Sequence, residues 1–96
     1  AARTASEIDT VAGKIRGLGR KAIAVPTDVS SEADVKRLVE RANTEFGKVD
    51  ILVNNAGIHG PVASVADLDM KELQRTIDIN LYGVILCSKA VLGQMI

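Results

Sequence analysis

Two adjacent amides end an apolar run in the sequence VDILVNNAGIHG, at residues 49–60. Asn54 and Asn55 each offer a donor and an acceptor, which suits a ribose hydroxyl or the backbone of a neighbouring strand. Gly57 has no Cβ, so a ligand could approach the main chain beside it. The run predicts a buried strand, and ligands of open α/β sheets bind beyond the carboxyl ends of strands. The position at the end of a strand suits a ligand site, and an ordinary turn rich in Asn and Gly explains the same residues equally well.

A third amide, Asn80, falls on the apolar side of a predicted helix, three residues after Ile77 and four before Val84. Asparagine is a poor helix former, and a buried amide without partners costs about 1–3 kcal/mol. We therefore expect Asn80 to point inward and to join a local polar network. The alternative is a structural amide that satisfies a backbone kink near Gly83.

Other residues with chemical potential give weaker signals. Residues 17–22, GLGRKA, have the letters of a dinucleotide fingerprint, but a helix precedes and a strand follows, which is the reverse of the order required. His59 has no second His or Cys at metal-ligand spacing, so we expect no metal site. We expect Asp67, Asp69 and Asp78 to serve helix caps and exposed faces rather than acid–base catalysis.

Composition argues against several classes of protein. The 96 residues include twelve basic and twelve acidic side chains without a Lys/Arg block, which argues against binding to nucleic acid or to a membrane surface. No stretch approaches the roughly 18 apolar residues of a membrane span. The single cysteine, Cys87, can form no internal disulfide, and we expect it to be a core residue. A lone cysteine fits a reducing compartment, so we expect a cytoplasmic protein.

Helix and strand patterns alternate along the chain. Candidate N-caps mark three amphipathic helices, glycines end the first two of them, and two apolar runs indicate strands. The first helix begins with Thr4 and Glu7, which have the spacing of a capping box. This alternation is typical of βαβ units and of a doubly wound parallel sheet, so we expect an α/β domain. The expected elements are helices at residues 4–18, 30–47 and 69–95 and strands at residues 21–29 and 49–55.

Four segments together resemble the short-chain dehydrogenase/reductase family. NNAG directly follows an apolar strand, AAR and TDVS are similar to the ends of the family's second and third strands, and DLDMKELQRTIDINLYG is similar to its fourth helix with the catalytic Asn. The resemblance spans the whole chain. It implies a Rossmann-type doubly wound sheet with helices on both faces, and hydride transfer between a nicotinamide cofactor and a carbonyl or alcohol.

The resemblance also implies roles for individual residues. Asp28 would accept a hydrogen bond from the adenine amino group, with Val29 beside the ring, unless Asp28 is only a turn residue. Asn54 would tie neighbouring strands together. Asn80 would complete a Ser/Tyr/Lys/Asn tetrad by holding a water in its proton relay. The expected cofactor-binding residues, which must then share one rim, are Arg3, Asp28, Val29, Asn55, Ala56 and Gly57.

Arg3 bears on the choice of cofactor. It directly follows Ala2. At the position of Ala2, family members that prefer NAD carry an acidic residue, so this chain lacks that carboxylate. An arginine can pair with a 2′-phosphate, whereas a carboxylate accepts from the free 2′-hydroxyl and repels phosphate. We therefore expect NADP, with NAD possible. Arg3 could instead be a solvated residue ahead of a helix.

The family's glycine-rich loop and its YxxxK signature are missing, since Tyr82 is the only tyrosine and Leu86 follows it four residues later. We therefore expect residues 1–96 to be an incomplete NAD(P)-binding Rossmann domain, from second strand to fourth helix, and to be inactive alone. In the strand order 3-2-1-4-5-6, the missing first strand would leave a gap in the parallel sheet.

The expected function is that of part of an NADP-dependent oxidoreductase. Its partners would be a small carbonyl or alcohol substrate and further copies of the chain, as a dimer or tetramer, because the third helix is apolar on more than one side. The alternative is a non-catalytic dinucleotide-binding or regulatory module that has lost the tyrosine and lysine. A flavodoxin-like domain without nucleotide is a more remote possibility, against which NNAG, TDV and Asn80 argue.

Overall fold

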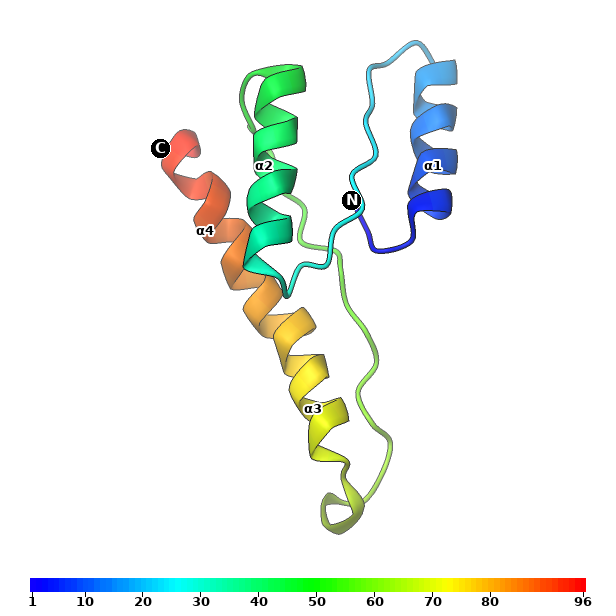
Figure 1. The fold of residues 1–96 in the computed structure, drawn as a ribbon, viewed down its shortest axis with the longest axis vertical. Coiled ribbons are helices and arrows are strands. Elements are labelled where there is room, and N and C mark those ends of the chain that lie inside the picture. Colours follow the sequence, from blue (N-terminus) through cyan, green and yellow to red (C-terminus); the bar gives the residue numbers. More distant parts are fainter.

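The computed structural model describes residues 1–96, and its regular secondary structure is entirely helical (Figure 1). Helices α1 and α2 lie on either side of the extended chain that joins them, and the last two helices form one long diagonal rod. A 3₁₀ turn precedes this rod and a π-type turn lies within it. The bounds are α1 Ala5–Gly17, α2 Glu32–Phe46, η1 Val65–Asp67, α3 Met70–Ile77, η2 Asp78–Tyr82 and α4 Gly83–Met95.

Helix α1 has the expected extent but not the expected cap. Thr4 occupies the N-cap position, yet its side chain makes no capping hydrogen bond, so the predicted capping box with Glu7 is wrong. At the other end, the Gly19 amide donates to the Arg16 carbonyl at 2.9 Å, and Gly19 has φ +84°. Glycine adopts this left-handed conformation without strain. Residues 17–22 are therefore a helix end, as predicted, and not a dinucleotide loop.

The other two helix starts are capped as predicted. The Ser31 hydroxyl accepts a hydrogen bond from the Asp34 amide at 3.3 Å, and α2 stops at Gly47, whose φ is +88°. The Asp69 carboxylate accepts from the amides two and three residues further on, at 2.9 and 3.3 Å. These side chains satisfy first-turn amides that have no carbonyl partner within the helix.

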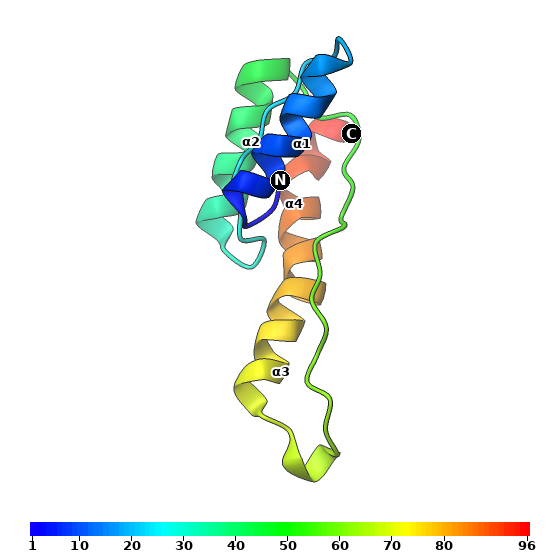
Figure 2. The same cartoon turned by 90° about the vertical axis from the view of Figure 1, so that its right-hand side faces the viewer.

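Helices α3 and α4 form one continuous helix because η2 joins them without a break. In η2 the Gly83 amide donates to the carbonyl of Asp78, five residues earlier instead of four. The helix and the extended chain beside it form an arm that projects from the rest of the molecule (Figure 2). By length and composition alone, Met70–Met95 could cross a membrane, with 22% of its most apolar window buried. The expectation that no segment meets this test is wrong, although core helices of soluble proteins also meet it.

The predicted strands are not paired into a sheet. The only β contact is one parallel bridge between Ala2 and Pro26, beside which the Thr27 amide donates to the Ala2 carbonyl at 2.9 Å. Residues 49–55 have no β partner at all. A strand needs a neighbour for its backbone donors and acceptors, and neither extended segment has one on both sides. The parallel sheet therefore remains a prediction for these residues.

An apolar groove of about 340 Å³ lies between the start of the chain and the extended segment that follows α2. Ala1 and Ala2 line one side, Val49 and residues 52–56 line another, and α2 and the long helix supply the rest. Nearly all the lining side chains are hydrophobic. The groove lies where the expected strand order places the missing first strand.

The core is small and joins α2 to the long helix. Val35 packs with Leu86 and Cys87, and the half-buried Val29 and Leu52 pack against them. Cys87 is thus a buried core residue, as predicted. Burial raises the pKa of its thiol, so the neutral form is favoured at physiological pH.

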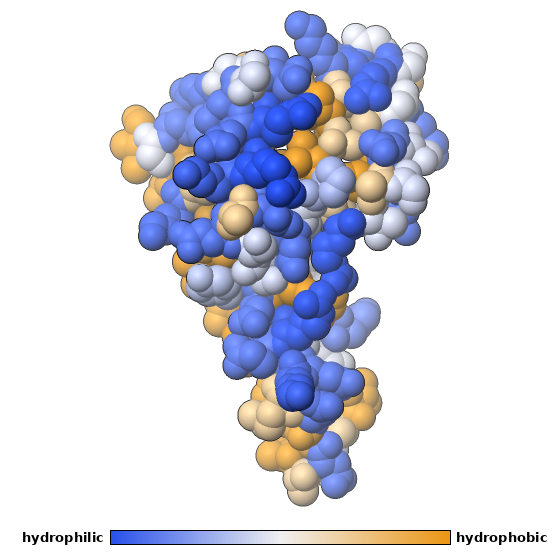
Figure 3. Space-filling model, in the orientation of Figure 1, coloured by the Kyte–Doolittle hydropathy of each residue, from blue (hydrophilic) through white to orange (hydrophobic).

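Much apolar surface is left exposed, because only nine of the 96 residues are buried. At the lower tip of the arm in Figure 3, hydrophobic residues lie at the surface around η1, where Val62 and Val65 are fully or almost fully exposed. On the long helix, Leu81, Ile85 and Leu92 are each more than half exposed. Such surface normally packs against further protein.

Candidate functional site

Polar side chains of the long helix fix the segment that contains the adjacent amides. Gln94 Oε1 accepts from the Val49 amide at 2.8 Å, and Asn54 Nδ2 donates to the Ser88 hydroxyl at 3.3 Å. Asn54 therefore bonds a helix. Its predicted bond to a neighbouring strand is not formed, because no strand lies beside it.

Asn80 and Ile58 form a double hydrogen bond. The Ile58 amide donates to Asn80 Oδ1 at 2.9 Å, and Asn80 Nδ2 donates to the Ile58 carbonyl at 2.8 Å. Both functions of the side chain thus bind one backbone residue of the loop after NNAG. The predicted polar network exists, but the predicted inward position is wrong, since Asn80 is exposed. The π-type turn interrupts the 3.6-residue repeat on which that placement depended.

Gly57 lies against this pair of hydrogen bonds. A Cβ at position 57 would stand 3.3 Å from Asn80 Oδ1, a distance that requires the amide to move. The absence of a side chain at Gly57 therefore allows the loop to approach the helix. The same absence leaves space beside the main chain.

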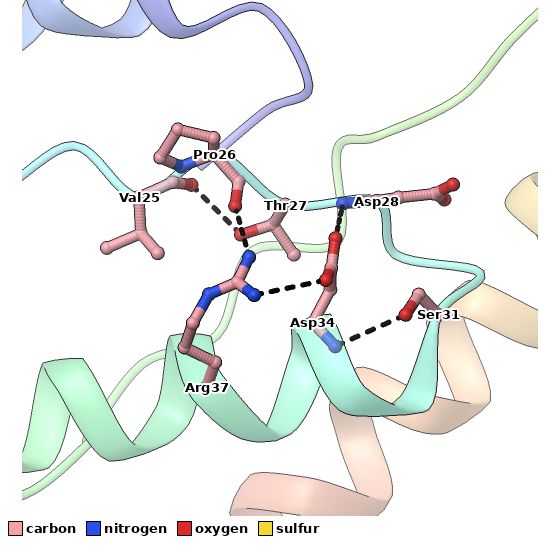
Figure 4. A network of polar contacts seen from close by, with 7 residues as sticks. All are labelled: Val25, Pro26, Thr27, Asp28, Ser31, Asp34 and Arg37. Atoms are coloured by element: carbon pink, nitrogen blue, oxygen red, sulfur yellow. Dashed lines mark hydrogen bonds and ion pairs between the residues drawn. The ribbon is translucent and has the colours of Figure 1, made fainter.

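The backbone around Asp28 is held by helix α2. Asp34 Oδ2 accepts from the Asp28 amide at 2.9 Å, and Arg37 pairs with Asp34 at 3.3 Å while donating to the Pro26 carbonyl at 3.0 Å (Figure 4). Ser31 caps the same helix in the same view. The Asp28 carboxylate points away from Asp34, so it is available for other partners.

One oxygen of the Asp28 carboxylate has partners in its own turn. Oδ1 accepts from the Ser30 hydroxyl at 2.6 Å and from the Ser30 amide at 3.0 Å, which is the turn contact considered as the alternative role. These hydrogen bonds lower the pKa of Asp28, and the positive charges of Arg75 and Arg3 lower it further, while burial opposes the shift. Oδ2 accepts no hydrogen bond within the chain and can accept one from a ligand.

The lowered pKa predicts how Asp28 affects stability in acid. Its folded-state pKa lies below 3.8, and the unfolded value is about 3.9. The stabilisation is therefore fully present above the unfolded value and is lost as pH falls through the folded value. We expect the difference in free energy of unfolding between the wild-type full-length protein and Asp28→Asn to be constant at neutral pH and to shrink below about pH 4. Urea unfolding at several pH values measures this difference, and a difference that grows in acid would contradict the assignment.

A cavity of about 200 Å³ lies between the Asp28 corner and the loop after NNAG. Its walls come from four segments that are distant in sequence: the start of the chain, the Asp28 corner, residues 56–58 and Ile79 of η2. Five predicted cofactor residues line it, namely Arg3, Asp28, Val29, Ala56 and Gly57. Asn55, the sixth, lines the adjoining groove, which shares Val29 and Ala56 with the cavity. The expected residues are thus brought together, and their binding of a cofactor stays a prediction.

The sequence does not predict every residue of this region, and three of the unpredicted ones bear on the site. Thr4 and Glu7 line the cavity, and the failed capping box explains why they were assigned elsewhere. Gly83 packs closely against Val29, which is part of the cavity wall. A Cβ at position 83 would stand only 2.7 Å from Val29 Cγ2. The signal for Gly83 was a glycine inside a long helix, which often marks close packing.

Known proteins are similar to this chain along nearly all of its length. A family model described as short chain dehydrogenase matches residues 1–96. Cis-4-hydroxycyclohexanecarboxylate dehydrogenase of Sinomonas cyclohexanicum is 46% identical over 87 residues, which cover 91% of this chain and 35% of that protein. The chain spans about a third of the length of the curated relatives that it matches.

Solved structures of other proteins superpose on nearly the whole of this chain. A 3-ketoacyl-ACP reductase from Sinorhizobium meliloti 1021 superposes with a TM-score of 0.94 at 39% identity, covering 97% of this chain and 36% of its own. A 3-ketoacyl-(acyl-carrier-protein) reductase from Brucella melitensis, complexed with NADH, gives 0.87 at 40% identity over 96% of this chain and 36% of its own. A blue fluorescent protein from a metagenomic library, in complex with NADPH, gives 0.84 at 29% identity over 94% and 36%.

Proposed function

The chain belongs to the short-chain dehydrogenase family, with its α/β fold, and from this premise we propose that it forms part of an NADP-dependent oxidoreductase. The complete enzyme would transfer hydride between the nicotinamide and a small carbonyl or alcohol. One observation supports this most strongly: Arg3, Asp28 and Gly57, from three distant segments, line one cavity. That arrangement suits the adenosine part of a dinucleotide.

The residues that line the cavity fit the cofactor. Asp28 has a carboxylate oxygen free to accept from the adenine amino group, and Val29 provides an apolar surface for the ring. Gly57 and Ala56 keep the opposite wall free of bulky side chains, and Asn55 lies next to them. The bound cofactor would supply the hydride, while these residues would hold and orient it.

Arg3 supports the preference for NADP. It lines the cavity and takes part in none of the three ion pairs of the chain, so its guanidinium is free to bind a 2′-phosphate. We expect Arg3→Ala in the full-length protein to weaken NADP binding about tenfold or more and to change NAD binding little. Isothermal titration with both cofactors measures this, with Arg20→Ala as the control because Arg20 lies outside the cavity. Equal losses for NADP and NAD would contradict the role of Arg3.

We propose that Asn80 supports the proton relay by positioning rather than by direct contact. Both ends of its side chain are bound to Ile58, which fixes the loop after Gly57. The water of the relay would then be held by a main-chain carbonyl of η2, where the five-residue spacing frees a carbonyl from its usual partner. The tyrosine, lysine and serine of the tetrad would come from parts of the protein outside residues 1–96.

The sheet would be completed by a strand from the same longer protein. We propose that this strand fills the groove between Ala2 and Leu52 and pairs with the start of the chain on one side and with residues 49–55 on the other, giving a Rossmann-type parallel sheet. The apolar lining and the unpaired backbone on both sides support this placement. Residues 1–96 would then be one incomplete part of an NAD(P)-binding domain.

The exposed side of the long helix supports a homo-oligomer. Leu81, Ile85 and Leu92 lie on its outer surface, and we propose that they pack against a second copy in a dimer or tetramer. The inner side of the helix packs on α2 through Leu86 and Cys87, which favours a core helix over a membrane span. A cytoplasmic location without nucleic-acid partners completes the proposal, consistent with one reduced cysteine and balanced charge.

The experiment that tests the function uses the purified full-length protein. We expect it to oxidise NADPH in the presence of a carbonyl from a panel of ketoacyl, sugar, steroid and small-ketone substrates. Cofactor binding without turnover of any substrate would favour the alternative, a dinucleotide-binding or regulatory module. A full-length sequence with a YxxxK segment beyond residue 96 would favour the enzyme, and failure to bind either dinucleotide would refute both.

A further inference from the structure

Glu7 places an unexpected carboxylate in the cavity that contains Arg3. Both residues line the 200 Å³ hollow, together with Thr4 and Asp28. Glu7 makes no ion pair with Arg3 or with any other residue, and Thr4 makes no capping bond. Position 2 carries no carboxylate, because Ala2 occupies it, but that position alone does not set the charge of the cavity. Glu7 offers a carboxylate from the first turn of α1.

The charge of Glu7 has opposite effects on the two cofactors. A carboxylate accepts hydrogen bonds from free ribose hydroxyls, and it repels a 2′-phosphate, which has a charge of about −1.5 to −2 at neutral pH. Arg3 acts in the other direction, because it attracts the phosphate. The two side chains thus have opposite effects on the preference of one cavity for NADP over NAD.

We propose that Glu7 is a specificity-determining residue that weakens the preference for the phosphorylated dinucleotide created by Arg3, so that NAD is also accepted. The proposal rests on the proposed function, since it concerns which dinucleotide the cavity holds. Glu7 also lies in the first turn of α1, where a negative charge stabilises a helix whatever the ligand. The two roles differ in their observable effects, because only the first changes the ratio of the two affinities.

The test measures dissociation constants of the full-length protein for NADP and NAD by isothermal titration. Glu7→Gln is expected to tighten NADP binding about three- to fivefold and to leave NAD binding equal or slightly weaker. In Arg3→Ala protein the same substitution should tighten NADP binding by a similar factor, because Glu7 makes no ion pair with Arg3 and acts on the phosphate directly. Asp9→Asn, the same change of charge on α1 but outside the cavity, should leave the ratio unchanged.

The outcomes separate this proposal from the proposed function. If both dinucleotides bind and Glu7→Gln leaves the ratio of their constants unchanged, the proposal is overturned while the function stands. An equal shift in Asp9→Asn would overturn it as well, since the effect would then be one of net charge. A wild-type protein that binds neither dinucleotide would refute the proposed function, and the role of Glu7 with it.

Discussion

Replacing Asn80 with alanine is expected to lower the kcat of the full-length oxidoreductase about 100-fold. The substitution removes both hydrogen bonds to Ile58 and leaves its amide and carbonyl without these partners. The loop that contains Gly57 is then free to move, and a displacement of about 1 Å near a reacting centre can cost that much in rate. Steady-state kinetics with saturating cofactor measure the effect. Asn80→Asp keeps the acceptor for the Ile58 amide and is expected to be intermediate.

Gln94→Ala is the matched control for Asn80→Ala. Gln94 is an amide on the same helix that also bonds the backbone of the extended segment, at Val49, but it does not line the cavity. We expect its loss to reduce stability by about 1 kcal/mol and to change kcat little. A kcat of Asn80→Ala within about twofold of the wild type, or an equal loss in Gln94→Ala, would show that the double hydrogen bond does not position the site.

Gly83→Ala is expected to have the second large effect. The new Cβ would stand 2.7 Å from Val29 Cγ2 and 3.2 Å from the Val29 carbonyl, at a buried position where the backbone cannot give way easily. Such overpacking costs about 1–3 kcal/mol of stability. Because Val29 lines the cavity, its displacement should also weaken cofactor binding about tenfold. Thermal unfolding and a cofactor titration of the full-length protein measure the two effects.

Gly93→Ala on the same helix separates packing from helix propensity. A Cβ at Gly93 meets no atom within 4 Å, so the substitution should stabilise the helix by about 0.5–1 kcal/mol. If Gly83→Ala were as stable as Gly93→Ala and bound cofactor normally, the close contact with Val29 would be refuted.

The helices could be predicted from the sequence because their signals are local. Ser31, Asp69 and Gly47 act within one turn of the residues they cap, so a linear pattern contains the information. The strands could not be confirmed, because the signal that decides strand pairing is not local. Residues 49–55 have the composition of a buried strand, but pairing depends on a neighbour distant in sequence, and here none lies beside them.

The site was predictable only where the family resemblance supplied long-range information. That resemblance placed Asp28 and Gly57 near each other, and the cavity contains both. Periodicity alone misplaced Asn80, because the π-type turn changes the helical repeat. Glu7 was assigned to a capping box whose spacing is correct but whose hydrogen bond does not form. No local pattern predicts that Gly83 packs against Val29, a contact across more than half of the chain.

A structure of the full-length protein bound to NADP tests the central claim most directly, namely that Arg3, Asp28 and Gly57 form the adenosine site. We predict that the adenine amino group donates to the Asp28 carboxylate, that the ring lies against Val29, and that the 2′-phosphate lies beside Arg3. A dinucleotide bound elsewhere on the protein, with Asp28 and Arg3 both free of it, would contradict the assignment.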